Sequence, residues 1–145
     1  MTLKVYTIGH STRKVNEFFK VLSSYHIKLI IDVRRFPTSR KFPWFNKDNL
    51  SKELKDLGIE YVHLPELGGF RSGGYKMFME TLEFKTGIEK LLKILEKSKE
   101  NVAIMCSEKF FWRCHRRFIA DFLTNLGFEV IHILNGKIYR HKLKF

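Results

Sequence analysis

The sequence predicts an α/β fold, a three-layer sandwich with a mostly parallel sheet between helices on both faces. Short apolar segments alternate along the chain with segments whose apolar residues recur every three or four positions. Right-handed crossovers join such segments and keep the strands parallel. The last two apolar segments flank Asn135-Gly136, a typical hairpin turn, which predicts a C-terminal antiparallel edge hairpin. A length of 145 residues suits a single domain over 1–145.

The first half of the chain alternates strand and helix. One strand breaks at Gly9, and the next contains a continuous β-branched run, as expected of a strand covered on both faces. Two of the three prolines lie in one segment without periodicity, which predicts a loop. The predicted elements are a strand at 3–8, a helix at 15–25, a strand at 28–33, a loop at 36–45 and a helix that Asn46 caps and Gly58 ends.

The second half continues this alternation. Pro65 stops a strand, and the glycine-rich residues after it predict an irregular loop. Thr86 and Glu89 have the spacing of a capping box, which would start a helix. The predicted elements are a strand at 59–64, a loop at 66–74, a helix at 86–95, a strand at 102–105, a helix with Phe111, Phe118, Ile119, Phe122 and Leu126 on one face, a strand at 130–134 and a basic edge strand at 138–143.

The chain is strongly basic, with a formal charge of +12 and an isoelectric point near 9.8. Such an excess attracts polyanions, so an anionic small molecule or a nucleic acid is an expected partner. The alternative is that lysines beside glutamates simply coat the solvent faces of the helices. The sequence contains no glutamine, and a composition rich in Lys and Glu suits a thermophile.

The composition predicts a soluble cytoplasmic protein. No apolar run approaches the roughly 20 residues of a membrane span, and no export signal precedes the first strand, so no membrane association is expected. In a reducing compartment Cys106 and Cys114 are thiols or ligands rather than a structural disulfide.

Polar side chains follow the apolar strands at the points where the strands end. Because the carboxyl ends of parallel strands share one edge of the sheet, these side chains are expected to converge on one ligand site. The pairs are His10 with Ser11, Asp32 with Arg34, His63 with Glu66, and Cys106 with Glu108.

Four phrases of the sequence resemble one family. They are YTIGHS at 6–11, DVR at 32–34 with Pro37 and Ser39, GIEYVHLPELGG at 58–69, and CSE at 106–108 followed by CHR at 114–116. Together they resemble the family catalogued as domain of unknown function 488, almost from end to end. The resemblance implies no settled activity, so it supports the fold boundary and the motif positions without naming a substrate.

The most reactive side chains lie between residues 106 and 116. Cys106 at a strand end is similar to a phosphatase nucleophile, but Arg113 follows at seven positions, one more than the usual loop has. The alternative is a low-pKa thiolate near the arginines and a helix N-terminus. His115 shares a helical face with Phe118, so it is either a buried core residue or a proton carrier. Cys114 is either a small packing residue or a ligand.

The candidate site combines proton-transfer groups with anion-binding groups. Guanidinium groups bind phosphate with two parallel hydrogen bonds, and paired glycines let backbone amides approach an anion. Aromatic residues between basic ones either stack on unpaired bases or pack over the sheet edge. The predicted catalytic residues are His10, Asp32, Cys106, Glu108 and His115. The predicted ligand-binding residues are Ser11, Arg34, His63, Glu66, Gly68, Gly69, Arg71, Cys114 and Arg116.

No nucleotide fingerprint indicates a particular cofactor, and the cysteine spacing matches no zinc motif, so no metal ligands are predicted. These residues favour an intracellular enzyme, a hydrolase or transferase that acts on a phosphate-bearing substrate, either a nucleotide or a nucleic acid. Two alternatives stay open. The charge and the basic-aromatic loops favour a non-catalytic nucleic-acid-binding module, and the cysteines and histidines favour a thiol or metal-binding protein.

Overall fold

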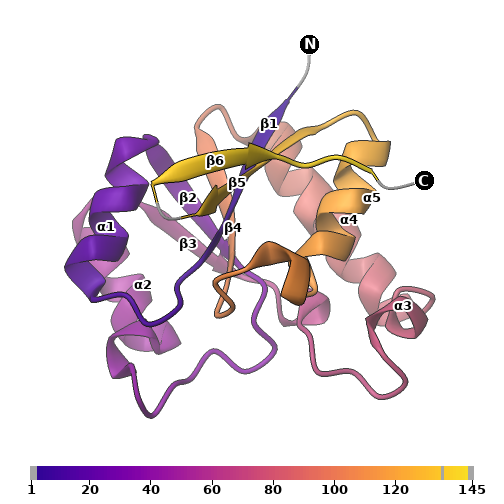
Figure 1. Ribbon diagram of the computed structural model, residues 1–145, viewed down its shortest axis with the longest axis horizontal. Coiled ribbons are helices and arrows are strands. Elements are labelled where there is room, and N and C mark those ends of the chain that lie inside the picture. Colours follow the sequence, from indigo (N-terminus) through magenta and orange to yellow (C-terminus); the bar gives the residue numbers. More distant parts are fainter. Residues whose placement is uncertain (1–2, 135, 144–145) are drawn as a thin grey trace.

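The computed structural model describes residues 3–134 and 136–143, and its centre is a six-stranded sheet (Figure 1). Its strands are β1 (Lys4–Gly9), β2 (Ile27–Asp32), β3 (Glu60–His63), β4 (Asn101–Cys106), β5 (Glu129–Leu134) and β6 (Lys137–Arg140). They lie in the order β3-β2-β4-β1-β5-β6. All neighbours are parallel except β5 and β6, which form the predicted antiparallel edge pair.

Helices cover both faces of the sheet, which confirms the predicted α/β sandwich. The helices are α1 (Val15–Ser24), α2 (Lys47–Asp56), α3 (Tyr75–Phe78), α4 (Leu82–Lys97) and α5 (Arg116–Asn125). α1 and α2 lie on one face, and α4 and α5 lie on the other (Figure 1). Single turns of 3₁₀ helix occur at η1 (Pro43–Phe45), η2 (Pro65–Leu67) and η3 (Phe111–Arg113). None of the helices in the described part of the chain is long and apolar enough to cross a membrane.

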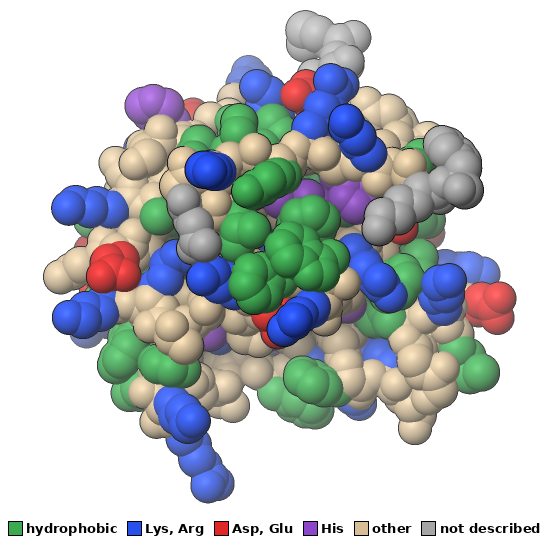
Figure 2. All heavy atoms as spheres, viewed as in Figure 1, with side chains coloured by type: hydrophobic (Ala, Val, Ile, Leu, Met, Phe, Trp, Pro, Cys, Tyr) green, Lys and Arg blue, Asp and Glu red, His purple; other side chains and the backbone are tan. Residues whose placement is uncertain are grey.

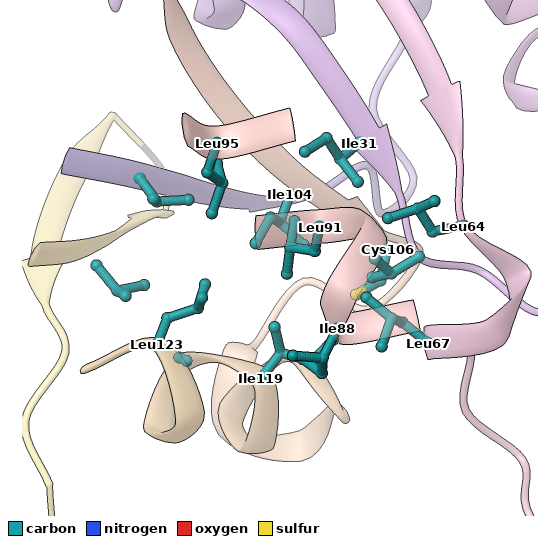
Figure 3. Close-up of a cluster of buried hydrophobic side chains, with 14 of the residues drawn as sticks. Ile31, Leu64, Leu67, Ile88, Leu91, Leu95, Ile104, Cys106, Ile119 and Leu123 are labelled. Atoms are coloured by element: carbon teal, nitrogen blue, oxygen red, sulfur yellow. The ribbon is translucent and has the colours of Figure 1, made fainter. Parts of the chain in front are cut away.

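Each face of the sheet has its own apolar core. On one face Phe18 and Leu54 from α1 and α2 pack against the strands. On the other face Leu91 and Ile119 from α4 and α5 do so (Figure 3). The Cys106 side chain, at the end of β4, belongs to this second core, so its thiol lies in apolar surroundings.

Helix α4 begins before the predicted capping box. Thr81 is its N-cap, and the Thr81 hydroxyl accepts a hydrogen bond from the amide of Phe84 at 3.2 Å. The prediction at Thr86 was wrong because Phe84 is buried and extends the apolar stripe of the helix by a turn. Gly87 lies inside this helix, where a Cβ atom would lie 2.8 Å from Leu67 Cδ2. The missing side chain therefore lets η2 pack closely on α4.

Phe111 does not lie on the helix after β4, which corrects the predicted stripe. It lies in η3, and α5 begins only at Arg116. The Phe111 ring stacks on His132 of β5, with 3.6 Å between ring centroids. Phe111 makes this contact although its spacing in the sequence fits the helix. Leu126 follows α5 and is 53% exposed, so it also lies outside the buried stripe.

The C-terminal edge strand is shorter than predicted. β6 ends at Arg140, whereas the sequence pattern predicts a strand to residue 143. Gly136 has a φ of 73°, a conformation that glycine adopts easily in tight hairpin turns. Asn135, the first residue of the predicted turn, lies outside the described residues.

Backbone hydrogen bonds hold the ends of β1 and β4 together. The amide of His10 donates to the carbonyl of Cys106 at 2.9 Å, and the amide of Ser11 donates to the next carbonyl at 3.0 Å. Gly9 makes this approach sterically feasible, because a Cβ atom there would lie 1.8 Å from the carbonyl oxygen of Glu108. The chain after β1 thus runs alongside the chain after β4, and their polar side chains are neighbours.

Candidate functional site

A cleft of about 1050 Å³ opens at the carboxyl edge of the sheet. Four separate segments form its walls: residues 10–12 after β1, residues within 34–42 after β2, residues within 69–75 around the start of α3, and residues within 106–118 from β4 into α5. The loops that contain them gather at one end of the sheet (Figure 1). Open α/β sheets bind their ligands at this edge.

Two free thiols lie side by side in the lining of the cleft. The Sγ atoms of Cys106 and Cys114 are 2.8 Å apart. Burial, together with the bond to Cys114, raises the pKa of Cys106, so Cys106 keeps its proton and donates it. This hydrogen bond, aided by His115 and Arg116, outweighs burial and lowers the pKa of Cys114 to about 4. Cys114 is therefore a thiolate at neutral pH.

His115 presents one ring nitrogen to this thiolate. Its Nε2 lies 2.9 Å from the carbonyl oxygen of Val33, which can only accept, so Nε2 carries a hydrogen. Its Nδ1 lies 3.3 Å from Cys114 Sγ. Gly69 lets the neighbouring loop approach, because a Cβ atom there would lie 3.0 Å from Nδ1. The two side chains can thus exchange a proton, as nucleophile and base do in cysteine-dependent enzymes.

The start of α5 adds further positive charge near the sulfur. The backbone amide of Arg116 donates to Cys114 Sγ at 3.4 Å. The Arg116 guanidinium is 1% exposed and donates to Thr7 Oγ1 at 3.0 Å and to the carbonyl oxygen of Glu108 at 2.8 Å. Arg116 therefore lies behind the cleft lining, where it holds the loop after β4 to the sheet and stabilises the thiolate.

His10, Arg34 and Asp32 form a second buried cluster beside the cleft. Asp32 is fully buried and pairs with Arg34 at 2.7 Å, and it also accepts a hydrogen bond from Tyr61. Arg34 Nη1 donates to the carbonyl of Phe45 at 2.8 Å and lies 3.4 Å from His10 Nε2. Burial, together with the charge of Arg34, lowers the pKa of His10 to about 4. His10 is thus neutral at pH 7, and it lines the cleft with Arg34 whereas Asp32 does not.

The structure brings most of the predicted site residues to the cleft. Those that line it are His10, Ser11, Arg34, Gly69, Arg71, Cys106, Glu108, Cys114 and His115. Those that do not are Asp32, His63, Glu66, Gly68 and Arg116.

The residues outside the lining support its walls. His63 Nε2 lies 2.7 Å from the carbonyl oxygen of Arg34, and Glu66 pairs with Lys90 at 2.7 Å on the surface. A Cβ atom at Gly68 would lie 2.4 Å from Arg35 Cα, so the glycine permits two loops to meet. These contacts position the backbone after β2 and β3.

Arg117 and Tyr75 are among the lining residues that the predicted set did not contain. Arg117 follows the buried Arg116 and is exposed, with its guanidinium 4.5 Å from the centre of the Phe118 ring. Consecutive residues of a helix point about 100° apart, so two adjacent arginines cannot both face inward. The neighbouring Arg116 could therefore have indicated that Arg117 faces outward. Tyr75 stacks against Phe118, 5.6 Å between centroids, and lies 5.3 Å from His115. It belongs to α3, which is too short to leave a periodic pattern.

Among residues 3–134 and 136–143, no group of three His, Cys, Asp or Glu side chains is arranged to hold a metal ion. Searches of the curated proteins and of the solved structures found no match to the chain. The family described as "Domain of unknown function DUF488" matches residues 14–123, a segment that includes three of the four cleft walls. The match covers well over half of the sequence, and the chain therefore belongs to the DUF488 family.

Proposed function

We propose that the protein is an enzyme that binds a phosphate-bearing substrate, a nucleotide or a nucleic acid, in this cleft and uses Cys114 as its nucleophile. The observation that carries the proposal is the position of Cys114 Sγ, 3.3 Å from His115 Nδ1 and 3.4 Å from the amide nitrogen of Arg116, in the lining of the cleft. Cysteines that only pack in a core have raised pKa values, whereas reactive ones lie near positive groups and helix N-termini. Both cysteines belong to the apolar core, but Cys114 alone also contacts His115 and the backbone amide at the start of α5.

The chemistry that suits this pair is group transfer through sulfur. Cys114 Sγ attacks an electrophilic atom of the substrate and forms a covalent bond to it. The bond to the leaving group breaks, and the leaving group takes a proton from His115. His115 or Glu108 then deprotonates a water molecule, which displaces the thiolate and releases the product. The enzyme is a hydrolase if water is the acceptor and a transferase if another nucleophile is.

Arginines on the cleft walls support a phosphate-bearing substrate. Arg35, Arg113 and Arg117 line the cleft, and none of them is in an ion pair within the described part of the chain. By contrast, Arg34 and Arg71 pair with Asp32 and Glu83 and hold the walls in place. The first three are therefore the groups available to a phosphate.

A substrate panel with matched variants tests the proposal. The panel contains nucleotides, phosphate monoesters, phosphodiesters and short oligonucleotides. An activity found with the protein should fall by about 10³-fold or more in Cys114→Ser. It should fall by about 10²- to 10⁴-fold in His115→Asn. Ser23→Ala, at an exposed position of α1 outside the cleft lining, is the control and should retain the activity.

Covalent trapping provides a readout that needs no turnover. Intact-mass measurement after mixing with the substrate should show an adduct, and peptide mapping should place it on Cys114. An activity that survives Cys114→Ser unchanged would remove Cys114 as the nucleophile.

A thiol–disulfide protein is the second candidate. The distance of 2.8 Å between the two Sγ atoms favours it, because a small movement would bring the sulfurs to the roughly 2.05 Å of a disulfide bond. Under this alternative, Cys106→Ser and Cys114→Ser would abolish function equally, whereas the enzyme proposal requires only Cys114.

A further inference from the structure

Three exposed aromatic side chains lie in the lining of the cleft. Phe36 is 61% exposed, Phe70 is 88% exposed and Trp112 is 47% exposed. They come from three separate walls: the loop after β2, the loop before α3, and η3. Large aromatic residues are usually buried in a core, and three in one cleft make an apolar surface that a ligand can cover.

An arginine precedes or follows each of these aromatic residues in the sequence. The pairs are Arg35-Phe36, Phe70-Arg71 and Trp112-Arg113. The Arg35 guanidinium lies 5.1 Å from the centre of the Phe36 ring, and the Arg113 guanidinium lies 5.4 Å from that of Phe110. On the face seen in Figure 2, hydrophobic side chains gather near the centre, and lysine and arginine side chains surround them. Each exposed ring of the cleft thus has an arginine next to it in the sequence.

The loop around Phe70 holds its ring in solvent at a conformational cost. Phe70 has a φ of 58°, in the left-handed region that disfavours residues other than glycine. Its carbonyl oxygen accepts a hydrogen bond of 2.8 Å from Arg35 Nη1. Arg71, the next residue, donates to the carbonyl oxygens of Gly68 and Pro65 at 3.0 Å and 2.9 Å. Strained backbone that neighbouring contacts maintain is a common feature of ligand sites.

The charges along the cleft complement a polyanion. Arg35, Lys109, Arg113 and Arg117 line it without an ion-pair partner among the residues that the structure describes. Glu108 is the one acidic residue of the described lining, and its Oε1 accepts a hydrogen bond from the amide of Phe110 at 3.3 Å. The positive charge is therefore in excess where the exposed rings lie.

The cleft is large enough for a ligand of at least the size of a nucleotide. Its volume of about 1050 Å³ lies at the upper limit of sites for drug-sized molecules, which are roughly 300–1000 Å³. Bases in a duplex are stacked on each other and their faces are not free to meet aromatic side chains. Unpaired bases expose these faces, and stacking on them tolerates any sequence.

We propose that the cleft binds single-stranded nucleic acid, with unpaired bases stacked on Phe36, Phe70 and Trp112 and phosphates held by Arg35, Arg113 and Arg117. This inference names the substrate class of the proposed function. Its consequence for catalysis rests on that proposed function. It places a nucleotide of the bound strand next to Cys114.

Fluorescence anisotropy with a labelled single strand of about 12 nucleotides tests this assignment. Single-stranded DNA, single-stranded RNA and a duplex of the same sequence are compared at salt concentrations from about 50 mM to about 200 mM. Affinity for at least one single strand should exceed that for the duplex. Phe36→Ala, Phe70→Ala and Trp112→Ala should each weaken it by roughly 5- to 150-fold.

Two variants control for folding and for surface apolarity. Trp112→Phe should keep most of the affinity, because it retains a stacking ring. Leu57→Ala removes an apolar side chain that is 51% exposed and lies outside the cleft lining, and it should not change the affinity. Urea denaturation of each variant identifies any that are unfolded.

Two outcomes overturn the inference: no binding of either single strand at the lowest salt, or binding that is equally strong for the duplex and insensitive to all three alanine variants. Neither outcome touches the reactivity of Cys114, which is measured separately. Conversely, single strands could bind as expected to the wild-type protein and to Cys114→Ser, while the wild-type protein shows no activity that depends on Cys114. That result would support this inference and exclude the proposed catalysis.

Discussion

Cys106 donates a hydrogen bond to Cys114 across 2.8 Å, and the two chemically identical side chains consequently have pKa values shifted in opposite directions. Cys106 lies at the end of a buried strand in an apolar core, and burial keeps it protonated. Cys114 lies before α5, between Cys106, His115 and the amide of Arg116. One thiol thus stabilises the charge on the other.

Removal of the Cys106 thiol should weaken the acidity of Cys114. A hydrogen bond to a charged group contributes about 1.5–3 kcal/mol, which corresponds to about 1 to 2 pKa units. In Cys106→Ala the pKa of Cys114 should therefore rise by about that amount. The ultraviolet absorbance of the thiolate, titrated in this variant and in wild type, measures the shift. An unchanged titration would show that Cys106 does not stabilise the thiolate.

Mild oxidation should join the two sulfurs. A peroxide converts the Cys114 thiolate to a sulfenic acid, and Cys106 then attacks its sulfur, with loss of water, to form a disulfide. The intact mass should fall by two hydrogens, and a reductant should reverse the change. Cys106→Ala is the matched control, because it should stop at the sulfenic acid or go on to higher oxides. A wild-type protein that takes up oxygen without losing two hydrogens would contradict this geometry.

Asp32 should matter for stability more than any surface acid. It is fully buried, and its carboxylate binds Arg34 and Tyr61. Asp32→Asn leaves the Arg34 charge buried without its partner, and the free energy of unfolding should fall by about 3–5 kcal/mol. Glu66→Gln breaks the surface pair with Lys90 and should cost less than about 1 kcal/mol. Urea unfolding compares the two, and equal small losses would argue against a structural role for the Asp32 pair.

Acid should destabilise the fold through two buried histidines. Burial lowers the pKa of His10 to about 4 and, together with the charges of His141 and Arg116, that of His132 to about 3. In the unfolded chain each histidine has a pKa of about 6.5, so it takes up its proton at a higher pH than in the folded protein. The free energy of unfolding therefore falls as the pH drops from about 6.5 to about 4 for His10 and to about 3 for His132. At pH 5 each histidine should cost about 2 kcal/mol.

The variant His132→Asn isolates one of these contributions. The loss in free energy of unfolding between pH 7 and pH 5, from urea titrations, should be smaller in this variant by about 2 kcal/mol. The same loss in the variant and the wild type would mean that His132 titrates alike in the folded and unfolded chain.

The sequence pattern was sufficient for the strands and for the edge where the cleft lies. Apolar runs such as residues 101–105 identify buried parallel strands, and the topology of such sheets gathers their carboxyl ends. His10 and Cys106 could be assigned to one edge on that basis alone. The start of α4 was harder to predict, because both Thr81 and Thr86 could cap the helix. Only the burial of Phe84 decides between them.

The division of roles within the site depends on distances that no sequence pattern contains. Cys106 and Cys114 lie in one short segment and have the same side chain, and their opposite pKa shifts arise from burial and from one hydrogen bond. Likewise, Arg116 and Arg117 are adjacent, yet the first lies beneath the loop and the second lines the cleft. Asp32 was predicted as a catalytic residue, and the structure places it behind the wall, in contact with Arg34.

The rate at which iodoacetamide alkylates Cys114, followed by peptide mass across the pH range, tests the central claim most directly. A thiolate stabilised by Cys106 and His115 predicts a midpoint well below that of an ordinary cysteine and full reactivity at neutral pH. A midpoint near that of an ordinary cysteine, about pH 8.5, would show that Cys114 is a packed thiol and not a nucleophile.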